Sequence, residues 1–300
     1  ESLSRMKLKS ADALQELTLD RREKYASDLF KYEAVSELIT AAATAGQGHV
    51  LLSQTLAASL RKMKAARQLV KKLKAAGYAT AYFGKWHMGG GRDVDDAPWP
   101  QAYGFDESLV SFEGLGDRII SNAKGVERAR ALGHGKVISC ERWERMQIQT
   151  ERTIDFIRRH RDDPFYVRLF PNDVHDAHVP RPGSADEFRS VSDDPYVRNF
   201  FAVLEEMDRQ IGRVISTIDE LNLSKKTLIL FTSDNGPTDW PKKYKTGPPA
   251  GFTGPYRGRK WSLFEGGIRM PFIARWTGTI PAGIEDTSSV MSAIDVSPTI

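Results

Sequence analysis

Apolar side chains recur at helical spacing over three stretches of the chain, and only loosely over a fourth, residues 1–43. The stretch 195–221 shows the pattern most clearly, because Phe201, Leu204 and Ile211 fall on one face of a helix. Residues 1–43 contain neither glycine nor proline and are rich in helix-favouring Leu, Ala, Glu and Lys. The predicted helices cover residues 1–43, 55–76, 141–160 and 195–221.

Short apolar runs of strand composition alternate with these helices. They cover residues 78–83, 165–170, 227–232 and 271–276, whereas 92–135 reads as a loop-rich region with scattered glycines. Strands that alternate with long helices indicate a parallel sheet with helices on both faces. We therefore predict an α/β fold with a mostly parallel central sheet.

Polar residues follow three of the predicted strands directly. These are Lys85 and His87, His175 and His178, and Asp234 and Asn235. In open parallel sheets, ligands bind beyond the carboxyl ends of the strands. If the strands are parallel, all three groups meet at one edge of the sheet, and that edge is the predicted site.

Composition narrows the possible functions only slightly. The 300 residues are 40% hydrophobic and 27% charged, with a net charge of +4, which is typical of a globular domain. This small charge fits an anionic substrate but is not the clustered basic surface of a nucleic-acid-binding protein. No apolar run approaches the roughly 20 residues of a membrane span. We therefore expect neither a nucleic acid nor a membrane as partner.

Lys85 and His87 stand in GKWHMGGG, after a predicted strand. In an extended chain, side chains two residues apart point the same way and lie about 6.5 Å apart. The two could therefore bind neighbouring oxygens of one tetrahedral anion, with Trp86 turned into the packing. For either residue alone, a solvated loop would be the simpler interpretation.

Asp234 and Asn235 offer a carboxylate and an amide oxygen, which are ligands that Ca²⁺ or Mg²⁺ prefers. Asp-Asn-Gly is also a common turn sequence, and for these residues alone a turn is the better interpretation. The two histidines after residue 170 could equally be surface residues.

Cys140 is the only cysteine, which excludes an intrachain disulfide, and we expect it to be a packed residue.

Several motifs together resemble those of the sulfatase family. GYATAYFGKWH at 77–87 is similar to the second sulfatase signature, and LFTSDNGP at 230–237 to the segment that supplies calcium ligands. RGRKWSLFEGGIRMP at 257–271 resembles the segment whose lysine contacts sulfate, here Lys260. Weaker matches are His178-Val179-Pro180 and YGFDESL at 103–109.

The resemblance implies an alkaline-phosphatase-like fold and hydrolysis of a sulfate ester, aryl or carbohydrate, at a calcium site. Lys85 and Lys260 would bind sulfate oxygens, and Asp234 and Asn235 would bind Ca²⁺. His87 would take a proton from the covalent intermediate. His178 would donate a proton to the leaving alcohol, with His175 as the weaker candidate. The family nucleophile is a formylglycine made in C/S-x-P-S-R.

The chain departs from the family pattern towards its start. No C/S-x-P-S-R is present, and Cys140 stands in a different context, ISCERWE. The family's first strand with its Asp-Asp pair is also missing, and Asp95-Asp96 is a poor substitute because it follows a glycine loop. We therefore expect a helical segment without family match at 1–54 and a sulfatase-like catalytic domain at 55–300, truncated at both ends.

Two alternatives remain open. A non-catalytic relative would bind sulfated glycans through the same lysines and histidines, and a phosphodiester or phosphonate hydrolase of the same superfamily would keep the metal and change the anion. A sulfated small molecule or glycan is the expected partner, and the oligomeric state is not determined. The resemblance implies a periplasmic or secreted location, although the chain starts at Glu1 without a signal peptide.

Overall fold

The computed structural model describes residues 69–86, 98–111, 116–175, 177–238 and 251–291. The helices and strands below belong to one compact unit, Val70–Asp286, and residues 1–69 and 287–300 form a second unit. The helix predicted at 1–43 and the boundary predicted at residue 54 lie outside the described residues. No helix in the described ranges is both long and apolar enough for a membrane crossing.

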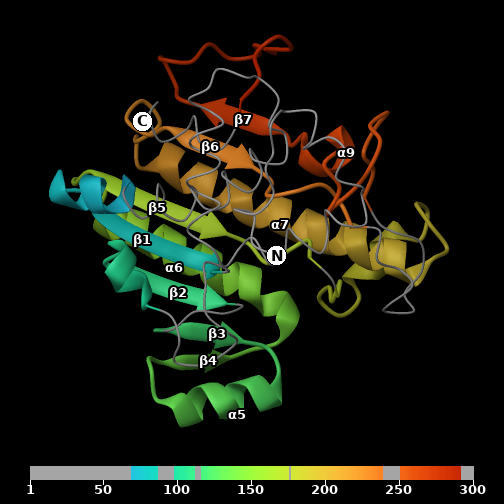
Figure 1. The fold of residues 1–300 in the computed structure, drawn as a ribbon, viewed down its shortest axis with the longest axis horizontal. Coiled ribbons are helices and arrows are strands. Elements are labelled where there is room, and N and C mark those ends of the chain that lie inside the picture. Colours follow the sequence, from blue (N-terminus) through green and yellow to red (C-terminus); the bar gives the residue numbers. More distant parts are fainter. Residues whose placement is uncertain (1–68, 87–97, 112–115, 176, 239–250, 292–300) are drawn as a thin grey trace, which may run out of the picture. The chain divides into compact units, whose positions relative to one another are not determined.

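A five-stranded parallel sheet forms the centre of this unit, and it confirms the predicted fold class (Figure 1). Its strand order is β4-β3-β2-β1-β5. The strands are β1 (Ala79–Lys85), β2 (Glu107–Ser111), β3 (Arg118–Ile120), β4 (Val137–Ser139) and β5 (Phe165–Phe170). Every neighbouring pair is parallel, so the carboxyl ends of all five strands lie at one edge.

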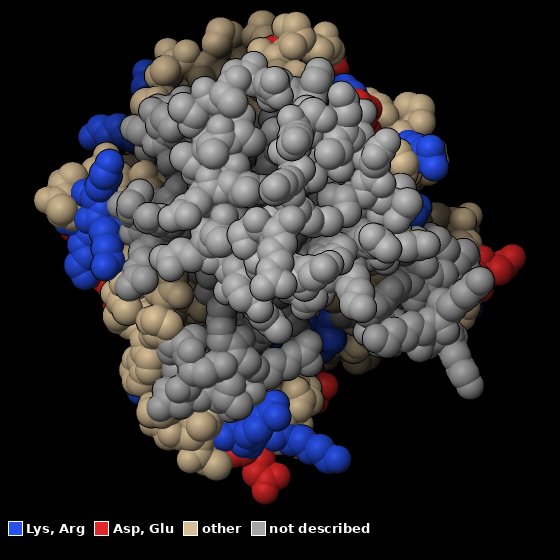
Figure 2. All heavy atoms as spheres, viewed as in Figure 1, with Lys and Arg blue, Asp and Glu red and all other residues tan. Residues whose placement is uncertain are grey.

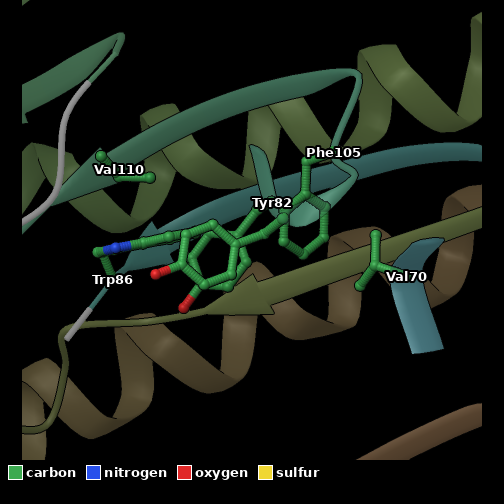
Figure 3. Close-up of a cluster of buried hydrophobic side chains, with 6 residues drawn as sticks. Val70, Tyr82, Trp86, Phe105 and Val110 are labelled. Carbon is green, nitrogen blue, oxygen red and sulfur yellow. The ribbon is translucent and has the colours of Figure 1, made fainter. Parts of the chain in front are cut away.

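Alternate residues of β1 face opposite sides of the sheet, as expected for a strand buried on both faces. Tyr82 belongs to one cluster of buried side chains, together with Val70, Trp86, Tyr103, Phe105 and Val110 (Figure 3). Phe83 belongs to the other, together with Ala81, Leu109, Ile119 and Phe156. The first cluster includes Val70 of the helical segment 69–75 and the second includes Phe156 of α6 (Arg145–Arg159), so helices cover both faces.

The two long helices agree closely with the predicted stretches. α6 (Arg145–Arg159) and α7 (Pro195–Glu220) contact each other. Asp194 caps α7 through its side chain, which accepts a hydrogen bond from the Tyr196 backbone nitrogen, and Pro195 takes the first helical position. The region expected to be loop-rich contains β2, β3, α5 (Ala123–Leu132) and the 3₁₀ helix η2 (Pro100–Tyr103), so the prediction of a long loop there was wrong.

The predicted strand at 227–232 takes a different place from the one expected. β6 (Ile229–Thr232) pairs antiparallel with β7 (Phe272–Arg275) in a separate two-stranded sheet. It is also only partly buried, and Phe231 is 37% exposed. In the part of the chain that the structure describes, β6 is therefore not a strand of the parallel sheet, contrary to our expectation.

Packing against α7 connects the two sheets. Ile229 of β6 and Phe165 and Val167 of β5 contact one cluster that includes Ile218 of α7. In Figure 1 the arrowhead of β6 points the same way as those of β1 and β5. The loop after β6 therefore leaves on the same side as the carboxyl edge of the parallel sheet.

Short elements complete the unit. They are the 3₁₀ helices η3 (Arg142–Glu144) and η4 (Ser184–Phe188) and the four-residue helix α9 (Glu265–Ile268). On the face drawn in Figure 2, basic and acidic side chains of the described residues both occur around the periphery. This mixed distribution agrees with the small net charge.

Candidate functional site at the strand ends

Lys85 is the last residue of β1 and lies at the carboxyl edge of the parallel sheet. It stands opposite Ser111, the last residue of β2, and its side chain is half-buried. Trp86 is only 2% exposed, and its ring lies 5.0 Å from those of Tyr82 and Tyr103. The prediction that Trp86 turns into the packing is confirmed, while His87 lies outside the described residues.

Gly84 allows β5 to approach β1 just before this edge. Its φ of +124° is unfavourable for other residues, and an added Cβ would lie 1.9 Å from the Phe170 carbonyl oxygen. Phe170 is the last residue of β5. The glycine therefore brings the ends of the two strands, and the loops that follow them, close together.

A buried polar network joins the ends of β2 and β5. The Ser111 hydroxyl donates a hydrogen bond to the Asn172 side-chain oxygen. Gln149 of α6 is fully buried, and its Nε2 lies 3.4 Å from both of these oxygens. Sequence reasoning missed all three residues, although the position of Asn172 just after a predicted strand was a usable signal.

The two histidines of the following loop have different surroundings. His178 is 9% exposed, its Nε2 lies 3.2 Å from the Val174 carbonyl oxygen, and its ring packs 4.9 Å from Tyr196 and 5.3 Å from Phe200. His175 is exposed. Of the two, His175 is therefore the one whose side chain a substrate can reach in this arrangement.

Two arginines and an aspartate lie beside the histidine loop. Arg142 donates a hydrogen bond of 3.0 Å from Nη2 to the His175 carbonyl oxygen. Burial raises the pKa of Asp173, although the positive charges of Arg145 and Arg142 oppose this. Burial lowers the pKa of Arg145, and the nearby Arg142 lowers it further.

Cys140 has the surroundings of a packed residue, as predicted. It is half-buried, it contacts the core cluster around Phe83, and its sulfur lies 3.8 Å from the Ser121 hydroxyl. Burial raises the pKa of its thiol. A neutral thiol of this kind is a weak nucleophile.

The loop after β6 contacts the loop that carries Lys260. The Lys260 backbone nitrogen donates to the Pro237 carbonyl oxygen at 2.9 Å, and the Gly236 nitrogen donates to the Gly267 oxygen at 3.0 Å. An added Cβ at Gly236 would lie 1.9 Å from the Gly266 oxygen, so the two loops pack too closely for a larger residue there. The contact brings Asn235 and Lys260 into the same region.

The oxygen atoms of Asp234 and Asn235 fit a hard cation such as Ca²⁺ in chemical type. Asp234 is exposed. The Asn235 side-chain nitrogen donates a hydrogen bond to the Gly236 oxygen at 3.0 Å, so the side-chain oxygen of Asn235 is the atom that could bind a cation. Calcium takes about six to eight oxygen ligands. Within the described ranges, no three His, Cys, Asp or Glu side chains are grouped so that they could hold a metal.

The predicted site residues thus form two groups. Lys85 and the two histidines lie at the carboxyl edge of the parallel sheet, connected by the Ser111–Asn172 hydrogen bond. Asp234, Asn235 and Lys260 lie in the loops beside the β6–β7 sheet. In Figure 1 the strands β1, β5 and β6 point the same way, so both groups lie on the same side of the sheets.

The sulfatase family model matches residues 39–300. The chain belongs to the sulfatase family. The chain is 27% identical over 285 residues to an N-acetylgalactosamine-6-O-sulfatase of Bacteroides thetaiotaomicron, a match that covers 75% of the chain and 53% of the relative. It is 37% identical over 150 residues to the steryl-sulfatase of Rattus norvegicus, covering 49% of the chain and 24% of the relative.

Solved structures agree with this assignment. The PsFucS1 sulfatase from Pseudoalteromonas sp. is similar with a TM-score of 0.52 and 27% identity, over 72% of this chain and 46% of that one. Ps i-CgsB in complex with k-i-k-neocarrahexaose has a TM-score of 0.61 at 24% identity, over 77% and 51% of the two chains, and supports the fold. The chain spans about half the length of the first of these curated relatives.

Proposed function

We propose that this chain contributes the sulfate-binding and proton-transfer residues of a site that hydrolyses sulfate esters. The observation that supports this best is the position of Lys85 at the carboxyl end of the buried strand β1, opposite Ser111. A half-buried ammonium group there can bind sulfate oxygens and offset the charge that develops as the S–O bond breaks. Lys260 would act in the same way from its own loop.

Carbohydrate sulfates are the substrates that we favour. Several relatives that match most of the chain are N-acetylgalactosamine-6-sulfatases, one from Bacteroides thetaiotaomicron and one from Canis lupus familiaris. An arylsulfatase from Hemicentrotus pulcherrimus matches 76% of the chain at 28% identity. Aryl sulfates are therefore the second substrate class.

Proton transfer is assigned to histidines. A group that donates a proton to the leaving oxygen must come within hydrogen-bond reach of it. The family resemblance points to His178 as the proton donor. In the structure, however, His178 is buried against Tyr196 and Phe200, whereas His175 is exposed. We favour His175 as the donor, with His178 holding the loop in place, and His87 as the base.

Asp234 and Asn235 would hold a calcium ion, which adds positive charge next to the sulfate. Their oxygens are of the right type, and further ligands would have to complete the shell. A formylglycine nucleophile does not fit these 300 residues, because none stands in C/S-x-P-S-R. We therefore derive no step through that group.

A second candidate is a binding protein for sulfated glycans. Lys85 and Lys260 could retain affinity for sulfate without turnover, because removing a nucleophile lowers the rate while leaving ligand contacts in place. The phosphodiester or phosphonate hydrolase is the third candidate, and it differs from the proposed sulfate-ester hydrolase in the preferred anion.

Thermal unfolding of the 300-residue chain tests the proposal. Sulfate and N-acetylgalactosamine 6-sulfate should raise the melting temperature, because a ligand that binds only the folded state stabilises it. Lys85→Ala should reduce this increase. Lys136→Ala is the matched control, since Lys136 is exposed and precedes β4 at the opposite, amino-terminal edge of the sheet.

Three results would count against the proposal. Equal effects of Lys85→Ala and Lys136→Ala would show that sulfate does not bind at the β1 end. Stronger protection by phosphate or a phosphonate than by sulfate would favour the third candidate. No protection by any of these anions would refute anion binding at Lys85.

A further inference from the structure

Arg142 and Arg145 form a second cationic feature at the same edge of the sheet. Arg142 belongs to η3 and Arg145 is the first residue of α6. The Arg145 Nε donates a hydrogen bond to the Arg142 carbonyl oxygen at 3.4 Å. The Arg142 Nη2 donates a hydrogen bond to the His175 carbonyl oxygen at 3.0 Å. The two guanidinium groups therefore lie between the start of α6 and the histidine loop.

The charge on Arg145 is poorly compensated. The groups that act on it are Arg142, Asp173 and Cys140, and of these Arg142 disfavours its charged form. Within the described ranges Arg145 forms no salt bridge, and its Nη2 is buried without a hydrogen-bond partner. A guanidinium that is largely removed from water is costly unless an anion pairs with it. The surroundings of Arg145 thus favour an additional negative group.

The nearby carboxylates do not supply that group. Asp173 is the carboxylate that interacts electrostatically with Arg145, yet burial raises its pKa, which weakens it as a counter-ion. Glu144 and Glu141 are held in a reciprocal capping box, in which each side chain accepts from the other residue's backbone nitrogen. Glu206 of α7 forms a salt bridge of 2.7 Å with Arg209.

Arg145 lies close to the proposed sulfate site. Gln149, one helical turn further along α6, has its Nε2 3.4 Å from the Ser111 hydroxyl, and Ser111 stands opposite Lys85. Arg145 and Lys85 are therefore separated by one helical turn, the Gln149–Ser111 contact and one strand spacing. Two anionic substituents on one sugar or on two linked sugars can span a separation of this kind.

We propose that Arg142 and Arg145 bind a second oxyanion of the substrate, a carboxylate or a further sulfate on the glycan that carries the scissile sulfate. This rests on the proposed function for the place of the first sulfate. The planar guanidinium group suits either oxyanion, because its N–H groups can form two parallel hydrogen bonds with it. The pair would make the site selective for glycans with more than one negative charge.

Calorimetry on the 300-residue chain with three probes tests this. The probes are inorganic sulfate, N-acetylgalactosamine 6-sulfate, and the unsaturated chondroitin 6-sulfate disaccharide, which adds a uronate carboxylate. A 4,6-disulfated N-acetylgalactosamine then distinguishes a second sulfate from a carboxylate. Arg145→Gln should weaken binding of the two probes that carry two separate oxyanion groups about tenfold, the loss expected for one charge-assisted hydrogen bond. Binding of inorganic sulfate and of N-acetylgalactosamine 6-sulfate, which carry a single oxyanion group, should stay unchanged.

Matched variants separate this effect from a general loss of structure. Arg152→Gln is the control, because Arg152 is exposed on the same helix. Arg145→Lys keeps the charge but loses the planar group, so it should give an intermediate loss. Should Arg145→Gln fail to fold, Arg142→Gln carries the same test, because Arg142 lies outside the regular part of α6.

The outcomes distinguish the two proposals. Equal weakening by Arg145→Gln of the probes with one and with two oxyanion groups would refute a second subsite, as would a wild-type chain that binds all probes equally well. A chain that binds the probes with two oxyanion groups through Arg145 but does not respond to Lys85→Ala would retain the arginine site and refute the proposed place of the first sulfate.

Discussion

The carboxylate of Asp106 should stabilise the fold through the link that it forms between two segments of the unit. It accepts hydrogen bonds from the Thr80 backbone nitrogen at 2.9 Å and from the Thr80 hydroxyl at 2.8 Å, and it lies 2.5 Å from the Lys74 ammonium. The Asp106 backbone nitrogen in turn donates to the Thr80 carbonyl oxygen at 2.8 Å. Asp106 therefore fixes the start of β1 beside the segment that leads into β2.

We expect Asp106→Ala to lower the free energy of unfolding by about 2 kcal/mol. Thr80 is fully buried, so its backbone nitrogen would lose a partner, which costs about 1–3 kcal/mol. The pair with Lys74 adds at most about 1 kcal/mol, because both side chains are well exposed. Asp106→Asn keeps an acceptor oxygen and should lose less. For a unit of this size, 2 kcal/mol lowers the melting temperature by about 4–8 °C.

The pH dependence provides an independent check. Burial raises the pKa of Asp106, but the hydrogen bonds from Lys74 and Thr80 outweigh it and hold the pKa below its usual value. The stabilisation by the charge is therefore fully present above the unfolded pKa of about 4 and is lost as the pH falls through the lower folded pKa. The stability difference between wild type and Asp106→Asn should be constant near neutral pH and shrink below about pH 4.

Urea unfolding at a series of pH values measures both quantities. Asp186→Asn is the control, because Asp186 pairs with Arg189 on the surface and contacts no buried donor. Its effect should stay within about 0.5 kcal/mol. Unchanged stability of Asp106→Ala at neutral pH would contradict the structural role, and a difference that persists well below both pKa values would contradict the role of the charge.

Four further predictions concern the site. Gly84→Ala should lower the free energy of unfolding by more than about 3 kcal/mol or prevent folding, because its Cβ would overlap the Phe170 oxygen; a normal melting temperature would refute the close approach. His178→Ala should destabilise the chain by about 1–3 kcal/mol through lost packing, whereas His175→Ala should leave stability unchanged. Calorimetry should show weak or no calcium binding, and tight binding that survives Asp234→Ala would mean that the metal site lies elsewhere. The 300-residue chain should give only background turnover of an aryl sulfate, and robust turnover that His175→Ala abolishes would reveal a nucleophile outside the expected context.

Long elements could be predicted from the sequence, and short ones could not. The apolar periods of α6 and α7 extend over several turns, so they identify α7 to within one residue and α6 to within four residues at its start. β3 and β4 have three residues each, which is too short for alternation to become visible. The helix between them, α5, did carry local signals, since Asn122 caps it and Gly133 ends it with a φ of +67°.

The residues of the candidate site divide in the same way, into those that a local sequence pattern reveals and those that it does not. Lys85 and Lys260 were predicted because each stands in a distinctive local motif. His175 and Asn172 both stand in a polar loop after a strand, and of these two only His175 was predicted. Gln149 could not be found in this way, because along the chain it is a polar residue on the buried face of a helix. Only the approach of β2 and β5 to α6 gives it its partners, Ser111 and Asn172.

The position of β6 determines how the two groups of predicted site residues are placed relative to each other. Because β5 and β6 belong to different sheets, no ladder of hydrogen bonds sets the distance between their loops in the described residues. Helix α7 sets it instead, since β5 and β6 contact the same cluster around Ile218. Arg275 of β7 forms a salt bridge of 2.7 Å with Asp219 near the end of this helix. Changes on α7 should therefore alter how Lys260 and Asp234 are placed relative to Lys85, even though α7 contributes none of the predicted site residues.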